Sequence, residues 1–272
     1  MAQLIKPTVA DYLGPMAADP EDRAWASGLL AQPVSRAASE ALRALLAGAE
    51  LPDVPDEDGA VAVLLLAPHI AELLAGRGVA PEVIAATVAD IGRHLRRHRR
   101  ATGEPGLLNW RWFHLHASGR LIEVERLQFE VLECAGDLRE LVGPWALNIH
   151  IPALSGPLTP EVVDSSLASG VEEVRRAWPG IRLRSAVCES WLLDPFLAER
   201  LPQSNIARFA ERFTPHGSPV DEPTDPLYFL WGHRDLGRLP ASPSTSLERV
   251  VVERIRAGGT WQTGRGALRL PS

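Results

Sequence analysis

A histidine and an asparagine on one predicted strand are the first residues in this sequence that suggest chemistry. In the stretch LNIHIP, residues 147–152, aliphatic side chains alternate with Asn148 and His150. Strand geometry then places these two polar side chains on one face. Imidazole changes its protonation near neutral pH, so His150 can act as a general base at the end of a strand. The alternative is a half-buried histidine that only makes hydrogen bonds within the fold.

A second group of reactive side chains lies in the stretch CESWLLDP, residues 188–195. Glu189 shares a predicted strand face with Trp191, and a carboxylate beside an apolar ring can serve as a base. Ser190 points to the other face, where its hydroxyl can give a proton to a leaving group. The alternatives are an ion pair between Glu189 and one of the arginines, and inert packing for Cys188.

The strand at 147–152 is followed by a Gly/Pro turn and a predicted helix that begins at Thr159. A helix N-terminus presents unpaired N–H groups and the positive end of the helix dipole, and therefore binds phosphate. Glu161 and Asp164 lie in the first turn, where they suit a solvated helix start and repel a phosphate. The corner is either an anion cradle or an ordinary connection between a strand and a helix.

Metal chemistry is not expected. His114 and His116 fall on one face of a predicted strand, but no third ligand accompanies them. Cys134 and Cys188 make neither a disulfide framework nor a zinc site.

The composition is that of an ordinary globular protein, with 46% hydrophobic and 23% charged residues in a chain of 272. A formal charge of −6 argues against a protein that binds nucleic acid over its whole surface. The first residues lack the apolar run of a signal peptide. The longest apolar stretch, residues 60–76, is shorter than a usual membrane span and contains Pro68, His69 and Glu72. We therefore expect a cytoplasmic protein with no nucleic-acid or membrane partner.

The first hundred residues predict helices. Ala- and Leu-rich sequence around Pro33 predicts two helices, and residues 60–76 predict another. Pro81 opens a further helix, which runs to about residue 100 and has an apolar stripe along one face. These elements predict a helical domain over residues 1–103.

Residues 104–272 predict strands that alternate with helices, which is typical of a mixed α/β sheet. Residues 108–133 predict a hairpin that turns at Ala117–Gly119, whereas residues 204–213 fit a strand or a helix. The remaining predicted elements are strands at 146–151, 182–193 and 226–234, helices at 160–177, 194–201 and 246–259, and a closing hairpin at 260–270. The predicted fold class is α+β.

Four separated segments carry a resemblance to a known family. They are WFHLHASGRLIEVERLQFE, LNIHIPALSGPLTPEVVDSSL, CESWLLDPFLAERLPQSNIARFAERF and RIRAGGTWQTGRGAL. Together they resemble a family of actinobacterial acyltransferase-domain proteins, which join a helical N-terminal N-acyltransferase-type domain to a GNAT-like C-terminal domain. The resemblance spans residues 104–272 for the GNAT-like domain, and the helical domain matches by composition and position.

The resemblance implies an acyl-CoA-dependent N-acyltransferase, with acetyl as the first expected acyl group, acyl-CoA as co-substrate and no metal. In the GNAT fold two neighbouring strands splay apart and admit acyl-CoA. By position, residues 147–152 are one of these strands, 153–159 the phosphate loop and 186–193 the other strand. The implied cofactor-binding residues are Ile149, His150, Ile151, Ala153, Ser155, Gly156, Leu158, Thr159, Ser204 and Asn205. The loop departs from the family pattern, because it has one glycine and because Pro157 and Pro160 lack N–H groups.

The reaction implied by the resemblance is direct attack of a small-molecule amine on the thioester. Glu189 or His150 is the expected base, and Ser190 the expected acid for the departing thiolate. A different possibility is a non-catalytic GNAT-like module that binds acyl-CoA or another small ligand. A third is a scaffold whose helical domain recruits another protein. The sequence indicates neither the acceptor nor an oligomeric state.

Overall fold

The computed structural model describes residues 18–154 and 156–271, and the chain divides into two compact units. The first unit comprises the described residues up to Val124 together with Arg176–Trp178. The second comprises Glu125–Arg175 and the residues from Pro179 onward. The main segment of the first unit therefore ends at Val124. The sequence predicted a domain boundary earlier, after residue 103.

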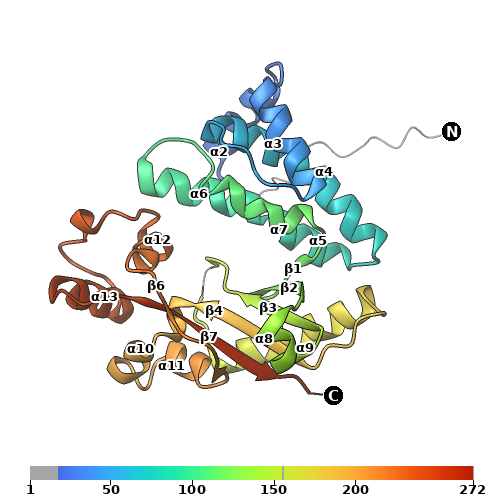
Figure 1. The fold of residues 1–272 in the computed structure, drawn as a ribbon. Coiled ribbons are helices and arrows are strands. Elements are labelled where there is room, and N and C mark those ends of the chain that lie inside the picture. Colours follow the sequence, from blue (N-terminus) through green and yellow to red (C-terminus); the bar gives the residue numbers. More distant parts are fainter. Residues whose placement is uncertain (1–17, 155, 272) are drawn as a thin grey trace. The chain divides into compact units, whose positions relative to one another are not determined.

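The first unit is mainly helical, as the sequence predicted (Figure 1). Ser35 starts one helix by accepting a hydrogen bond from the backbone N–H of Ala38 at 2.9 Å. The helix predicted to run from Pro81 to about residue 100 is two helices that meet at Ala89. The elements are α2 (Pro20–Leu30), α3 (Arg36–Ala47), α4 (Asp56–Gly76), α5 (Pro81–Val88), α6 (Asp90–Thr102), the 3-10 turn η1 (Trp110–Phe113), α7 (His114–Ala117) and the strand β1 (Leu121–Val124).

Helix α4 is longer than the sequence suggested. Its 21 residues make it, among the described residues, the one helix long and apolar enough to cross a membrane by length and composition. Burial within the protein accounts for this composition, because Val63, Leu64, Ile70 and Leu74 are all fully buried.

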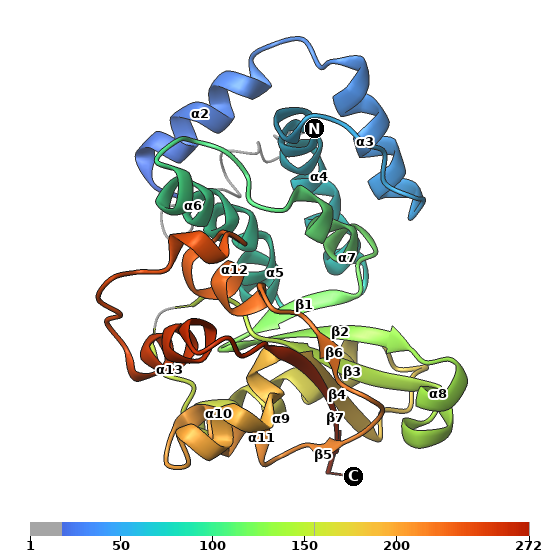
Figure 2. The same cartoon turned by 60° about the vertical axis from the view of Figure 1, so that its left-hand side comes forward.

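The second unit is built on a mixed sheet (Figure 2). The strand order is β2-β3-β4-β7-β5, and β6 also pairs with β7. β3 and β4 are parallel, whereas β2 with β3 and β4 with β7 are antiparallel. The elements are β2 (Leu127–Glu133), α8 (Gly136–Val142), β3 (Trp145–His150), α9 (Pro160–Ala177), β4 (Ser185–Ser190), the 3-10 turn η2 (Trp191–Leu193), α10 (Pro195–Arg200), α11 (Asn205–Ala210), β5 (Thr214–Pro215), β6 (Val220–Asp221), α12 (Asp225–Trp231), the 3-10 turn η3 (Leu236–Arg238), α13 (Ser246–Arg256) and β7 (Gln262–Arg269). The predicted α+β fold, with helices before a mixed sheet, is confirmed.

Close packing between α9 and β2 determines which sheet face is apolar. A Cβ atom on Gly170 would lie 2.3 Å from the ring of Phe129, so only glycine lets the helix approach this closely. Phe129 is paired with Ile149, and directly opposed antiparallel residues point to the same face. The polar residues Asn148 and His150 therefore lie on the face opposite α9.

The hairpin predicted for residues 108–133 is wrong in its first half. Residues 110–117 form helical turns, which bury Trp110 and Phe113. The chain turns later, between β1 and β2, where Glu125 adopts a left-handed φ of 55°. Aromatic residues suit a strand and a buried helical turn alike, so composition could not separate the two.

Two further strand predictions are also wrong. Residues 226–234, predicted as a strand, belong largely to α12, which has a proline in its first turn and ends at Gly232 with a φ of 75°. The predicted closing hairpin is the single strand β7. Residues 204–213, which fitted a strand or a helix, contain α11, and Ser204 caps this helix.

Candidate functional site

The ladder between strands β3 and β4 stops before the carboxyl ends of both strands. Their parallel pairing covers only Leu147 with Ala186 and Asn148 with Val187. β3 nevertheless continues to His150 and β4 to Ser190. The ladder therefore does not join the last residues of the two strands, and we call this unpaired end of β3 and β4 the opening. The sequence resemblance implied two strands that splay at this point.

A cluster of three polar side chains lies beside this opening. The antiparallel register places Glu130 of β2 directly opposite Asn148 of β3, on the same face as His150. Glu130 Oε2 accepts a hydrogen bond from Asn148 Nδ2 at 2.9 Å and lies 3.0 Å from His150 Nε2. The side chains of His150 and Glu130 are 21% and 15% exposed, so the pair is largely withdrawn from water.

Sequence reasoning missed Glu130. Alternation in LQFEVLE puts Gln128 and Glu130 on one strand face. That pattern does not say which strand lies beside β2 or in what register, and only the register brings the carboxylate to His150.

Glu189, the other expected base, forms an ion pair. It lies two residues beyond Val187, on the same sheet face as Asn148, and opposite Arg265 of β7. Arg265 donates from Nε at 2.9 Å and from Nη2 at 3.3 Å to the two carboxylate oxygens. The arrangement is the bidentate pair that the sequence left open as an alternative.

Ser190 and Cys188 point to the opposite face of β4. The Ser190 hydroxyl accepts a hydrogen bond from the backbone N–H of Leu192 at 3.1 Å and starts η2. Burial raises the pKa of the Cys188 thiol to about 12. A thiol in this state is a packing group and a poor nucleophile.

The loop after β3 contains most of the expected cofactor-binding residues. Its start is held by Arg126, whose Nη1 donates to the carbonyl oxygen of Pro152 at 2.8 Å. Thr159 caps α9, since its carbonyl and hydroxyl oxygens accept from the next turn at 3.0 and 3.4 Å. Ala153 and Gly156 are exposed, Leu158 is buried, and Ser155 lies outside the described residues. The remaining expected positions are Ile149, which is buried, Ile151, which is half-buried, and Ser204 and Asn205, which begin α11.

Two arginines from outside the loop accompany the start of α9. Arg212 donates to the carbonyl oxygen of Pro160 at 3.2 Å and forms an ion pair with Asp164. The hydrogen bond from Arg212 lowers the pKa of Asp164. Hydrogen bonds with its own backbone N–H and with Thr159 lower the pKa of Glu161, and the charge of Arg208 adds to this effect. Positive charge therefore lies beside both acids, Glu161 in the first turn of α9 and Asp164 after it.

The two histidines considered as metal ligands lie on the short helix α7, not on a strand. His116 is fully buried, with Nε2 3.4 Å from Asp90 Oδ2, whereas His114 is exposed. Within residues 18–154 and 156–271, no group of three or more histidine, cysteine or acidic side chains is arranged to hold a metal ion.

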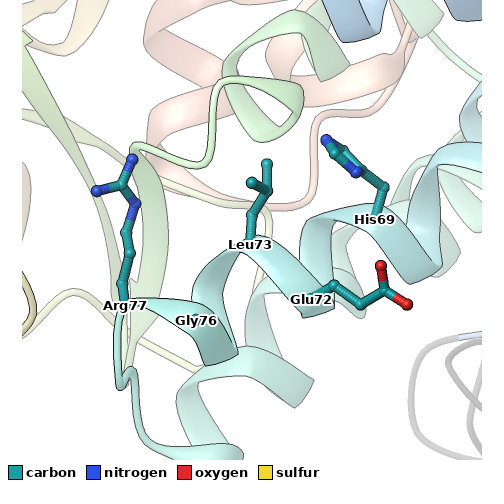
Figure 3. A pocket seen from close by; sticks show the side chains of 5 residues that line it. All are labelled: His69, Glu72, Leu73, Gly76 and Arg77. Atoms are coloured by element: carbon teal, nitrogen blue, oxygen red, sulfur yellow. The ribbon is translucent and has the colours of Figure 1, made fainter.

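Helix α4 of the first unit lines a shallow hollow of about 360 Å³ (Figure 3). The lining residues are His69, Glu72, Leu73, Gly76 and Arg77. Four of them lie in the C-terminal half of α4, and Arg77 is the residue that follows the helix as its C-cap (Figure 3). The hollow has no residue in common with the polar cluster on β2 and β3.

Comparison with known proteins covers both parts of the chain. Residues 121–268 match the family described as "GNAT-like C-terminal domain", which is more than half of the sequence. Residues 7–119 match the family described as "N-acyltransferase N-terminal domain". No curated protein sequence matches significantly.

Solved structures give the same result over almost the whole chain. The chain is similar to an acyltransferase crystallised with decanoyl-CoA, with 27% identity and a TM-score of 0.78 over 96% of this chain and 86% of that one. A mutant acyltransferase crystallised with octanoyl-CoA matches with the same identity, TM-score and coverage. An acyltransferase in complex with decanoyl-CoA and teicoplanin matches at 28% identity and a TM-score of 0.74, over 97% and 84% of the two chains.

Proposed function

The chain belongs to the acyltransferase family that joins an N-acyltransferase N-terminal domain to a GNAT-like C-terminal domain, and from this premise we propose that it transfers an acyl group from acyl-CoA to an amine. The observation that carries the proposal is the opening between β3 and β4 with His150 at its edge. Beyond the last ladder pair, the strand edges can offer backbone N–H groups to a ligand, and His150 supplies a base within the same strand.

The acyl-CoA is proposed to enter along the last residues of β3. Backbone groups of Ile149, Ile151 and Ala153 would hold the pantetheine and polarise the thioester carbonyl. The diphosphate would lie at the start of α9. Because Pro157 and Pro160 lack N–H groups, the amides of Leu158, Thr159 and Glu161 need help there. Arg208 and Arg212 are the cationic side chains near this end of the helix that could provide it.

The proposed chemistry is a direct transfer. The amine nitrogen attacks the thioester carbon, a C–N bond forms, and the C–S bond breaks. His150 removes a proton from the attacking nitrogen, and the departing CoA thiolate takes up a proton. The products are an amide and CoA with a restored thiol, so no oxidant or metal is required.

The acyl group is proposed to be longer than the acetyl group first expected. The structurally similar enzymes were crystallised with decanoyl-CoA and octanoyl-CoA, and one also contains the glycopeptide teicoplanin. We therefore propose medium-chain acyl-CoA as the donor and an amine on a glycopeptide-type molecule as the first acceptor class to test.

Calorimetry and thermal unfolding with CoA, acetyl-CoA, octanoyl-CoA and decanoyl-CoA test the proposal. Micromolar binding that raises the melting temperature is expected, with tighter binding of the longer chains. Tight binding without thiol release in the presence of any amine would instead favour the non-catalytic module. No binding at millimolar CoA would contradict both interpretations.

A further inference from the structure

We propose that Glu130 is a positioning residue for the transfer reaction, which acts by holding the imidazole of His150 in one tautomer. This inference rests on the proposed function, because it assigns His150 as the base. It concerns a residue of β2 that neither the strand opening nor the cofactor loop includes.

The hydrogen-bond geometry determines which ring nitrogen carries the proton. An ionised carboxylate only accepts hydrogen bonds, so the 3.0 Å contact between Glu130 Oε2 and His150 Nε2 requires a proton on Nε2. In the neutral imidazole the other nitrogen, Nδ1, then has the lone pair. Glu130 therefore makes Nδ1 the atom that takes the proton from the attacking amine.

Asn148 fixes the carboxylate that makes this contact. Its Nδ2 donates to the same Glu130 oxygen at 2.9 Å, and the two residues are directly opposed across the β2–β3 ladder. Side chains on two paired strands keep their separation better than side chains on loops. The Glu130 carboxylate is thus held between Asn148 and His150 by the register of the sheet.

The same carboxylate also favours the protonated product of the base. When Nδ1 takes up a proton, the resulting imidazolium forms an ion pair with Glu130. Both side chains are largely buried, so water screens this ion pair only weakly. Loss of the negative charge should therefore lower kcat. The KM for acyl-CoA should stay the same, because Glu130 is not proposed to contact this substrate.

Kinetics of Glu130→Gln, His150→Ala and the double variant test the proposal. We expect Glu130→Gln to lower kcat by about 10- to 100-fold and to have no further effect in the His150→Ala background. Glu133→Gln is the matched control, because Glu133 is an exposed glutamate on the same strand. Full activity of Glu130→Gln, or losses that multiply in the double variant, would overturn the proposal.

The imidazole ¹⁵N spectrum provides a readout that does not need turnover, with His150 assigned from the signals missing in His150→Ala. The wild-type protein should show the Nε2–H tautomer, and Glu130→Gln should show a mixture. An unchanged tautomer would refute the positioning role even if the enzyme is active. A changed tautomer in a protein without acyl transfer would support the contact and contradict the proposed function instead.

Discussion

Arg265 Nε donates to Glu189 Oε2 at 2.9 Å, and a second bond at 3.3 Å makes the pair bidentate. The two side chains are 40% and 52% exposed. The carboxylate is thus held by a cation on the neighbouring strand. His150 is the better candidate for the base, because it lies at the edge of the strand opening and a carboxylate orients its ring.

Substitution of the two candidate bases should have unequal effects. We expect His150→Ala to lower kcat by about 10²- to 10⁴-fold, the usual contribution of a general base. Glu189→Gln should lower kcat only a few-fold, because an exposed ion pair contributes about 1 kcal/mol or less to stability. Steady-state rates of thiol release from acyl-CoA measure both variants. Equal losses would contradict the assignment of His150.

Arg208 should contribute to CoA affinity. Its guanidinium lies close enough to Glu161, at the start of α9, to lower the pKa of that carboxyl. We expect Arg208→Gln to weaken CoA binding about tenfold, the loss of one charged contact, and to leave binding of the phosphate-free pantetheine fragment unchanged. Calorimetry measures both, with the exposed Arg249 on α13 substituted as a control. Equal effects of the two substitutions would argue against a phosphate site here.

Gly170 should not tolerate a side chain. An added Cβ would lie 2.3 Å from the Phe129 ring, between α9 and the sheet. Overpacking of a core typically costs about 1–3 kcal/mol, so Gly170→Ala should lower the free energy of unfolding by that amount. Gly28→Ala in α2 is the matched control, because nothing lies within 4 Å of its added Cβ and alanine favours helix. Denaturant unfolding compares the two, and a stable Gly170→Ala would show that α9 can move off the sheet.

A buried ionic network in the first unit should make stability depend on pH. Burial alone would raise the pKa of Asp90, but its interactions with His94, with the His116 imidazole 3.4 Å away and with the Arg93 guanidinium hold that pKa well below its usual value. Burial lowers the pKa of His94 below 6.5, although Asp90 opposes the shift. Both groups have a lower pKa in the folded state than in the unfolded state. Their contribution to the free energy of unfolding is therefore complete above the pKa values of the unfolded state. It is lost as the pH falls toward the pKa values of the folded state.

The melting temperature should accordingly fall between pH 7 and about pH 5, where the His94 contribution is lost first. His94→Gln should make this fall smaller, because glutamine does not take up a proton in that range. His114→Gln is the control at an exposed histidine of the same unit. A fall in melting temperature that is the same in His94→Gln and the wild type would exclude His94 as its source.

The sequence predicted the helices with clear boundaries and the strands of alternating pattern. The predicted helix at 160–177 has the bounds of α9, and β3 differs by one residue at each end from the strand predicted at 146–151. Residues 226–234 misled the prediction because their aromatic residues suit either element, and packing of α12 decided the outcome. Proline in the first helical turn and Gly232 at the end were the signals for a helix.

The site was less predictable than the fold. Alternation on β3 identified Asn148 and His150 as neighbours on one face, and the register confirms this arrangement. The partners of both expected bases come from other strands, Glu130 from β2 and Arg265 from β7. The pairing of strands depends on the whole sheet. No local pattern could therefore show that the partner of His150 is a carboxylate and the partner of Glu189 an arginine.

Acyl transfer itself is the most direct test of the central claim. The pure protein would be incubated with decanoyl-CoA and a panel of amines that includes a teicoplanin-type glycopeptide, and thiol release and product mass would be followed together. The account predicts amine-dependent release of CoA and an acceptor heavier by one acyl group, with His150→Ala strongly impaired. CoA binding without any acylated product, or equal turnover by His150→Ala, would contradict it.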